Sequence, residues 1–211
     1  SQFDSAVKLW DALRSPTPVQ LRQCFDTIKI QDFPYMSAAL MRFFRDYPSL
    51  ENGLSLTQEY LLSAISKPCQ SLPSLEKNLL DIAEAGRLPE GVDATERYQE
   101  IISGPPTFGR LFHQLQDIET APFMGDLWVK KELDVLAQAK VPFISCTFTD
   151  REHPVGNKTC YQITAAGQQA LDGELHWGDV NVYDLWRGGV HITENSPMFW
   201  DENSRAFTQV R

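Results

Sequence analysis

The residue best suited to acid–base chemistry is His191, because carboxylates lie near it on both sides in the sequence. Asp184 and Arg187 precede it, and Asp201 follows it. A carboxylate that orients an imidazole is the usual beginning of a general-base site. The intervening Gly188-Gly189 is also typical of a tight turn, and an aromatic-rich tail needs polar side chains to fix it in place. A structural role for these residues is therefore favoured over a catalytic one.

The other three histidines give weaker signals for chemistry. His113 lies in an aromatic helical pattern, which indicates a partly buried imidazole rather than a ligand. His153 has Asp150 and Glu152 beside it but no second histidine, so a solvated loop is favoured over a metal site. The context of His176 is uninformative. The sequence lacks a glycine-rich phosphate loop, an H-E-x-x-H motif and a C-x-x-C pair. We therefore expect no metal, no cofactor and no recognisable catalytic motif.

Composition and charge narrow the classes of protein that remain. The chain has 211 residues, of which 42% are hydrophobic, so it can bury a core without disulfides or a metal. The net charge of −9 argues against a non-specific binder of nucleic acid or anionic membranes. No apolar run approaches the roughly 18 residues of a membrane span, and no signal peptide begins the chain. We expect a cytoplasmic protein without membrane contact, and a fragment or processed product because the first residue is Ser1.

Hydrophobic periodicity predicts helices along most of the chain, with proline and glycine at their ends. The predicted helices span about 4–14, 17–25, 32–47, 55–66, 73–85, 94–103, 107–118 and 127–139. Ser55 begins a capping-box pattern with Gln58, Thr107 can cap the helix that follows it, and Asp126 is expected to cap the last of these helices. Alternating patterns then predict strands at 143–149 and 159–164, followed by a short helix at 165–171.

The order of these elements is that of a winged helix, in which three helices precede a two-stranded wing. The helices are 55–66, 73–85 and 127–139, and the segment 161–171 resembles the common ending in which the second wing strand runs into a closing helix. We predict a mainly α protein with three parts. A helical N-terminal region spans 1–53, a winged-helix-like domain spans 54–173 with a helical insertion at about 67–106, and an aromatic-rich tail that wraps the core spans 174–211.

The charge of helix 127–139 decides between a groove-reading helix and a core or interaction helix. This helix and its flanks carry three acids and three lysines: Asp126, Glu132, Asp134, Lys130, Lys131 and Lys140. A helix that enters the major groove normally carries an excess of basic residues that contact phosphates. Charge therefore disfavours DNA as the partner.

Several segments resemble a bacterial family known only as "domain of unknown function 1835". The resemblance rests on residues 45–58, 119–126 and 184–191, on Trp200-Asp201 and on the wing ending. Members of that family usually carry an N-terminal α/β region before the first helix seen here, so the resemblance implies that this chain is the part downstream of it. The stretch 67–106 is longer than the family usually has. The resemblance implies no activity.

We expect a regulatory or protein-interaction module whose partner is another protein. A sequence-specific DNA-binding transcription regulator is the first alternative, and an enzyme completed by an absent N-terminal α/β region is the second. The sequence does not indicate the oligomeric state, the partner or a substrate.

Two expectations concern packing. A hairpin centred on His153 would place Cys146 directly opposite Cys160, with both thiols reduced. The tail carries seven acids and three arginines, so it needs buried aromatic side chains to stay ordered. We therefore expect its tryptophans to pack on the helical body, Arg187 to bond a carboxylate or carbonyls, and His191 to be structural. These tryptophans are Trp177, Trp186 and Trp200.

Overall fold

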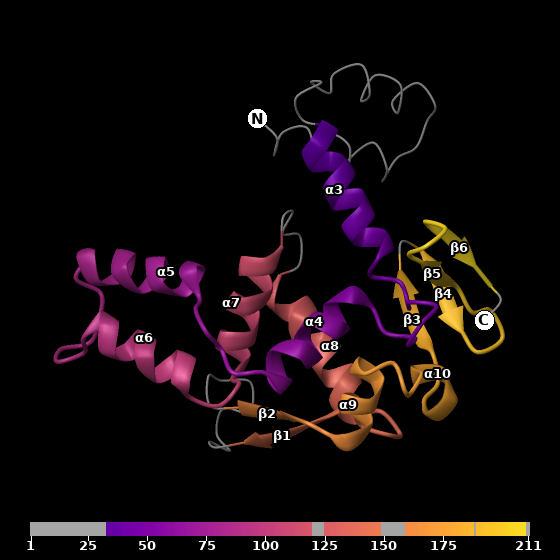
Figure 1. Ribbon diagram of the computed structural model, residues 1–211. Helices are drawn as coiled ribbons and strands as arrows, with labels where there is room; N and C mark the ends of the chain where they lie inside the picture. The colour runs from indigo at the N-terminus through magenta and orange to yellow at the C-terminus, as the bar shows by residue number, and fades with distance from the viewer. Residues whose placement is uncertain (1–32, 120–124, 149–158, 188, 210–211) are drawn as a thin grey trace. The chain divides into compact units, whose positions relative to one another are not determined.

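The computed structural model describes residues 33–119, 125–148, 159–187 and 189–209 (Figure 1). The chain divides into two compact units, one formed by residues 1–44 with 120–123 and the other by 45–119 with 124–211. In the first unit the described helix is α3, Phe33–Phe44, which confirms the third predicted helix but ends three residues before the prediction. The helices predicted at 4–14 and 17–25 lie outside the described residues.

The second unit is built around three helices that pack on one another. They are α4 (Leu56–Ser66), α7 (Phe108–Ile118) and α8 (Asp126–Gln138). Each contributes leucines that are almost fully buried: Leu61, Leu62, Leu111, Leu115, Leu133 and Leu136. The described residues are therefore mainly α, with three small antiparallel hairpins.

The helix starts follow local side-chain chemistry. Ser55 and Gln58 form the predicted capping box at α4, and the Thr107 hydroxyl accepts a bond from the Arg110 amide at α7. At α8 the prediction is wrong by one residue. Gly125 occupies the N-cap position and Asp126 is already the first helical residue, where its negative charge still favours the helix N-terminus.

The helices α5 (Pro73–Glu84) and α6 (Ala94–Ser103) form a separate helical hairpin that extends away from α4 and α8 (Figure 1). They pack on each other around Leu72, Leu75 and Tyr98, and α5 also packs on α7. The helix that joins α4 and α8 in the three-helix core is therefore α7, and the helix predicted at 73–85 packs with α6 in the separate hairpin instead.

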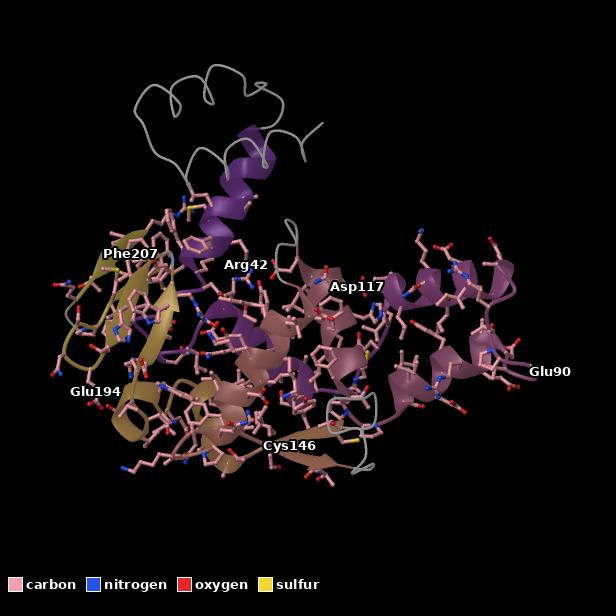
Figure 2. All side chains as sticks on the ribbon, turned by 180° about the vertical axis from the view of Figure 1, so that it is seen from behind. Arg42, Glu90, Asp117, Cys146, Glu194 and Phe207 are labelled. Carbon is pink, nitrogen blue, oxygen red and sulfur yellow. The ribbon has the colours of Figure 1, made fainter. Side chains whose placement is uncertain are left out.

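The hairpin after α8 consists of β1 (Ile144–Phe148) and β2 (Thr159–Ile163). Cys146 pairs with Tyr161, and Cys160 pairs with Thr147, so the two cysteines lie on opposite faces. The predicted Cys146–Cys160 pairing is wrong by one position. The paired strands enclose ten residues, 149–158, and an even number cannot be centred on a single residue such as His153. Cys146, labelled in Figure 2, is exposed.

The connection from β2 to α9 (Ala165–Leu171) requires a glycine at position 167. The Thr164 amide donates to Phe143 O at 3.0 Å, and its hydroxyl donates to Pro142 O at 2.7 Å. A Cβ atom at Gly167 would lie 2.1 Å from Phe143 O. Glycine is needed here because two backbone segments approach closely, which explains the glycine in the predicted wing ending.

The tail forms α10 (Trp177–Val180) and two hairpins, β3 (Asp184–Arg187) with β4 (Val190–Thr193) and β5 (Phe199–Asp201) with β6 (Ala206–Thr208). It returns to the segment before α4. The Trp177 amide donates to Asn52 O at 2.7 Å, and the Trp200 amide donates to Pro48 O at 2.9 Å. The tail is thus hydrogen-bonded to the helical body at two separate points.

Two of the three predicted tail tryptophans are buried. Trp177 and Trp200 are each 5% exposed, whereas Trp186 is 58% exposed. The expectation for Trp186 is wrong because β3 turns it to the outer face, opposite to its buried neighbour Arg187. There the indole stacks on the imidazole of His191, with ring centroids 4.5 Å apart.

Among the described residues, no helix combines the length and the apolar character that a membrane crossing requires.

These exposures predict a large difference between two tryptophan variants. Trp177→Ala removes a ring that packs edge-on against Phe143 and should lower the free energy of unfolding by about 3–5 kcal/mol. Trp186→Ala removes an exposed ring and should cost less than about 1 kcal/mol. Urea unfolding followed by circular dichroism measures both. Equal losses in the two variants would contradict the assigned packing.

Candidate functional site

A buried arginine joins the tail to the helical body. Arg187 is only 4% exposed, and its Nη2 donates to Glu132 Oε1 of α8 at 2.6 Å. Its Nε donates to Asp46 O at 3.0 Å. The Tyr47 hydroxyl in turn donates to Arg187 O at 2.9 Å. The prediction that Arg187 bonds a carboxylate or carbonyls is confirmed.

The network continues from Glu132 into the start of α4. Gln58 Nε2 donates to Glu132 Oε2 at 2.9 Å, and Gln58 Oε1 accepts from the Ser55 amide at 3.0 Å. The same glutamine that closes the capping box therefore also holds the buried carboxylate. Burial raises the pKa of Glu132, while Arg187 and Gln58 act in the opposite direction.

A cavity of about 370 Å³ lies beside this network, between α8 and the segment 181–187. Glu132, Gln58 and Arg187 contribute to its wall. This volume is within the range of small-molecule sites, and it also suits an apolar side chain of a partner. Val135 and Val182, both exposed, line the same cavity and give it an apolar edge.

The accessible face of α8 carries three exposed apolar side chains. Leu127 is 81% exposed, and Trp128 and Val135 are also exposed. Lys131 Nζ lies 5.2 Å from the centre of the Trp128 ring, and the guanidinium of Arg187 lies 5.7 Å from it. Two cations thus lie near one indole, which fixes the ring beside the cavity.

The structure brings together two of the four predicted site residues. His191 Nε2 lies 2.8 Å from Asp184 Oδ1 on the outer face of the β3–β4 hairpin, where both side chains are exposed. Arg187 belongs to the buried network described above. Asp201 binds the Ser204 hydroxyl at 2.6 Å and the Asn203 amide at 3.0 Å, so it fixes the turn between β5 and β6.

The exposed Asp184–His191 pair has the surroundings of a surface interaction. The imidazole is stacked on Trp186 within 2° of parallel. Water screens an ion pair at such a site, so the pair contributes on the order of 0–1 kcal/mol to hairpin stability. This arrangement supports the structural role that the sequence favoured for His191.

Sequence reasoning missed Glu132, Gln58 and Asp46 as parts of one network. A signal for Glu132 was present, because it stands beside Leu133 and three residues after Val129, within the stripe that α8 buries. A charged residue at such a position requires a buried partner. The sequence does not reveal which of the distant basic residues supplies it.

Comparisons of the chain with protein-family models, curated proteins and solved structures found no match. Within the described ranges, no group of three or more histidine, cysteine, aspartate or glutamate side chains is arranged to hold a metal ion. The interpretation of the site therefore rests on its own geometry.

The buried pair predicts unequal costs for two substitutions. Arg187→Met leaves the Glu132 carboxylate in the core without its cationic donor and should cost about 3–5 kcal/mol. Glu132→Gln keeps an acceptor for Arg187 and should cost less. Equilibrium unfolding at pH 7 measures both, and a larger loss for Glu132→Gln would contradict this assignment.

The raised pKa of Glu132 also predicts a pH dependence. Its ordinary value is 4.5, and the folded protein holds the proton more tightly than the unfolded chain does. The contribution of Glu132 to stability is therefore greatest below about pH 4.5 and is lost as the pH rises through the higher folded value. Compared with the Glu132→Gln variant, the unsubstituted protein should show a falling free energy of unfolding between pH 4.5 and 7. A parent that gains stability over this interval would show that the shift has the opposite sign.

Proposed function

We propose that residues 54–173 form a winged-helix-like domain that acts as a protein-interaction module. The packing of α4, α7 and α8, followed by the β1–β2 hairpin, supports this architecture. The segment before α7 adds to it. Thr107 forms an isolated antiparallel bridge with Cys160, and the Tyr161 amide donates to Pro106 O at 2.9 Å, so this segment is bonded to the edge of the hairpin.

The proposed function rests chiefly on the exposed apolar side chains of α8. In a winged-helix DNA-binding protein the corresponding helix presents basic side chains to phosphates. Here Lys130 is paired with Asp134, and Lys131 lies over Trp128. The prominent exposed side chain is Leu127, which favours burial against a protein surface.

The occupant that fits this face is an amphipathic segment of a different protein, with apolar side chains next to basic ones. Apolar side chains would cover Leu127 and Val135 and enter the adjoining cavity. Basic side chains would be attracted by a chain of net charge −9. Two copies of this chain repel each other, which disfavours self-association through the same face.

A pair of matched variants tests the docking face. Leu127→Glu places a charge on α8, and Leu80→Glu places one at another exposed leucine, on α5. A photo-crosslinking residue at position 131 of the full chain should capture a discrete partner, and Leu127→Glu should reduce the yield at least tenfold while Leu80→Glu does not. Unchanged yields in Leu127→Glu would contradict this face. A dimer that Leu127→Glu dissociates would show that the occupant is a second copy.

A DNA titration distinguishes the proposed interaction module from the first alternative, a DNA-binding transcription regulator. At about 150 mM salt, the chain should bind random duplex DNA more weakly than the roughly 10⁻⁴–10⁻⁶ M of non-specific binders. Fluorescence anisotropy with a labelled duplex measures this. Micromolar affinity that falls with added salt and with Lys131→Ala would favour the transcription regulator instead.

A further inference from the structure

A second buried arginine, Arg110 on α7, has an environment that differs from that of Arg187. It is 3% exposed, yet no carboxylate among the described residues forms an ion pair with it. Its Nη1 donates to Gly104 O and its Nε makes a long contact of 3.5 Å with Gln114 Oε1. Both acceptors are neutral. Burial lowers the pKa of Arg110, and the nearby Cys69 thiol acts in the opposite direction.

Arg110 lines a cavity of about 440 Å³ between the α5–α6 hairpin and the start of α7. Arg97, Glu100 and His113 also line this cavity. Arg97 and Glu100 form an ion pair at 2.9 Å, so their charges compensate each other. Because His113 is neutral, Arg110 supplies the net positive charge of the residues that line the cavity.

The first turn of α7 directs a backbone donor to the same place. Gly109 is the second residue of this helix and lines the cavity. Its amide has no hydrogen-bond partner in the described part of the chain, whereas the next amide, that of Arg110, is satisfied by the Thr107 hydroxyl. The positive end of the α7 dipole adds to the field of the guanidinium.

His113 supplies a further polar group on the cavity wall. Its Nδ1 lies 2.9 Å from Ser74 Oγ, and the Ser74 amide donates to Asp117 Oδ1 at 3.0 Å. Figure 2 shows Asp117 on α7, where the α5–α6 hairpin meets it. These contacts engage Nδ1 and fix the imidazole at the cavity wall.

We infer that this cavity binds the phosphate group of a small phosphorylated molecule. Arg110 would contact the phosphate oxygens with its guanidinium, and the Gly109 amide would donate from the helix N-terminus. The cavity is larger than inorganic phosphate alone requires, which favours a phosphate ester. The inference is independent of the proposed docking face on α8, because none of the residues that line this cavity belongs to α8.

The experiment titrates the full chain with inorganic phosphate and with ribose 5-phosphate at constant ionic strength, followed by ¹⁵N–¹H spectra. Both probes should shift the Gly109 amide in a saturable way, and the ester should bind at least fivefold more tightly. The Gly86 amide follows α5 in open space and serves as the internal control. If neither probe shifts Gly109, the inference is wrong. Tighter binding of inorganic phosphate than of the ester would overturn the assignment to a phosphorylated molecule.

Variants separate a binding role of Arg110 from a purely structural one at the end of α6. Arg110→Gln should abolish the Gly109 shift, but it can also disturb folding. Arg97→Ala therefore provides a second test, because Arg97 is partly exposed and lines the cavity. It should weaken ester binding at least threefold, while Arg87→Ala, which removes an exposed arginine outside the cavity, should leave binding unchanged. Equal affinities in Arg97→Ala and Arg87→Ala would overturn the placement of the site.

Discussion

The buried contact between Arg187 and Glu132 constrains the second unit of the fold more than any other described interaction. Taking a guanidinium and a carboxylate out of water costs several kcal/mol for each ion, and only close pairing with further hydrogen bonds offsets this cost. The two side chains come from β3 and α8. Arg187 forms a further hydrogen bond with the Asp46 carbonyl, and Glu132 forms one with the Gln58 side-chain amide. Neither α8 nor the tail can reach its native burial without the other.

This constraint gives α8 an unusual distribution of side chains. Glu132 is buried, while Leu127 on the same helix is 81% exposed. A helix that only filled the core would have the reverse pattern. The buried charge fixes the rotation of α8 against β3, and that rotation in turn presents the apolar residues outward. The internal ion pair and the external apolar face are therefore two results of one helix orientation.

The parts of the fold that were predictable from sequence are those decided by neighbouring residues. The capping box at Ser55 and the start of α7 at Thr107 each involve residues within a few positions of one another. The register of the β1–β2 hairpin was missed because it depends on whether the loop holds an odd or an even number of residues. The exposure of Trp186 was missed because it depends on which face of β3 is turned to the helical body.

The candidate site shows more clearly the difference between features decided by neighbouring residues and features decided by distant ones. That Arg187 needs an acceptor followed from the charge of the tail, but Glu132 lies 55 positions away and no local pattern connects them. Arg110 gave no signal at all, because a basic residue in the first turn of a helix is unremarkable until its burial is known. Long-range pairing of charges is a property of the folded chain, since it depends on which surfaces exclude water.

The α5–α6 hairpin has one more consequence. Its own core consists of Leu72, Leu75 and Tyr98, with a few partly buried neighbours, and it is therefore far smaller than the core around α4, α7 and α8. Such a segment behaves as a cooperative unit that opens at lower free energy than the rest of the molecule. Its amides should exchange with deuterated solvent first, while the leucine-rich helices stay protected. The α5–α6 hairpin can thus open locally while the larger helical core stays folded.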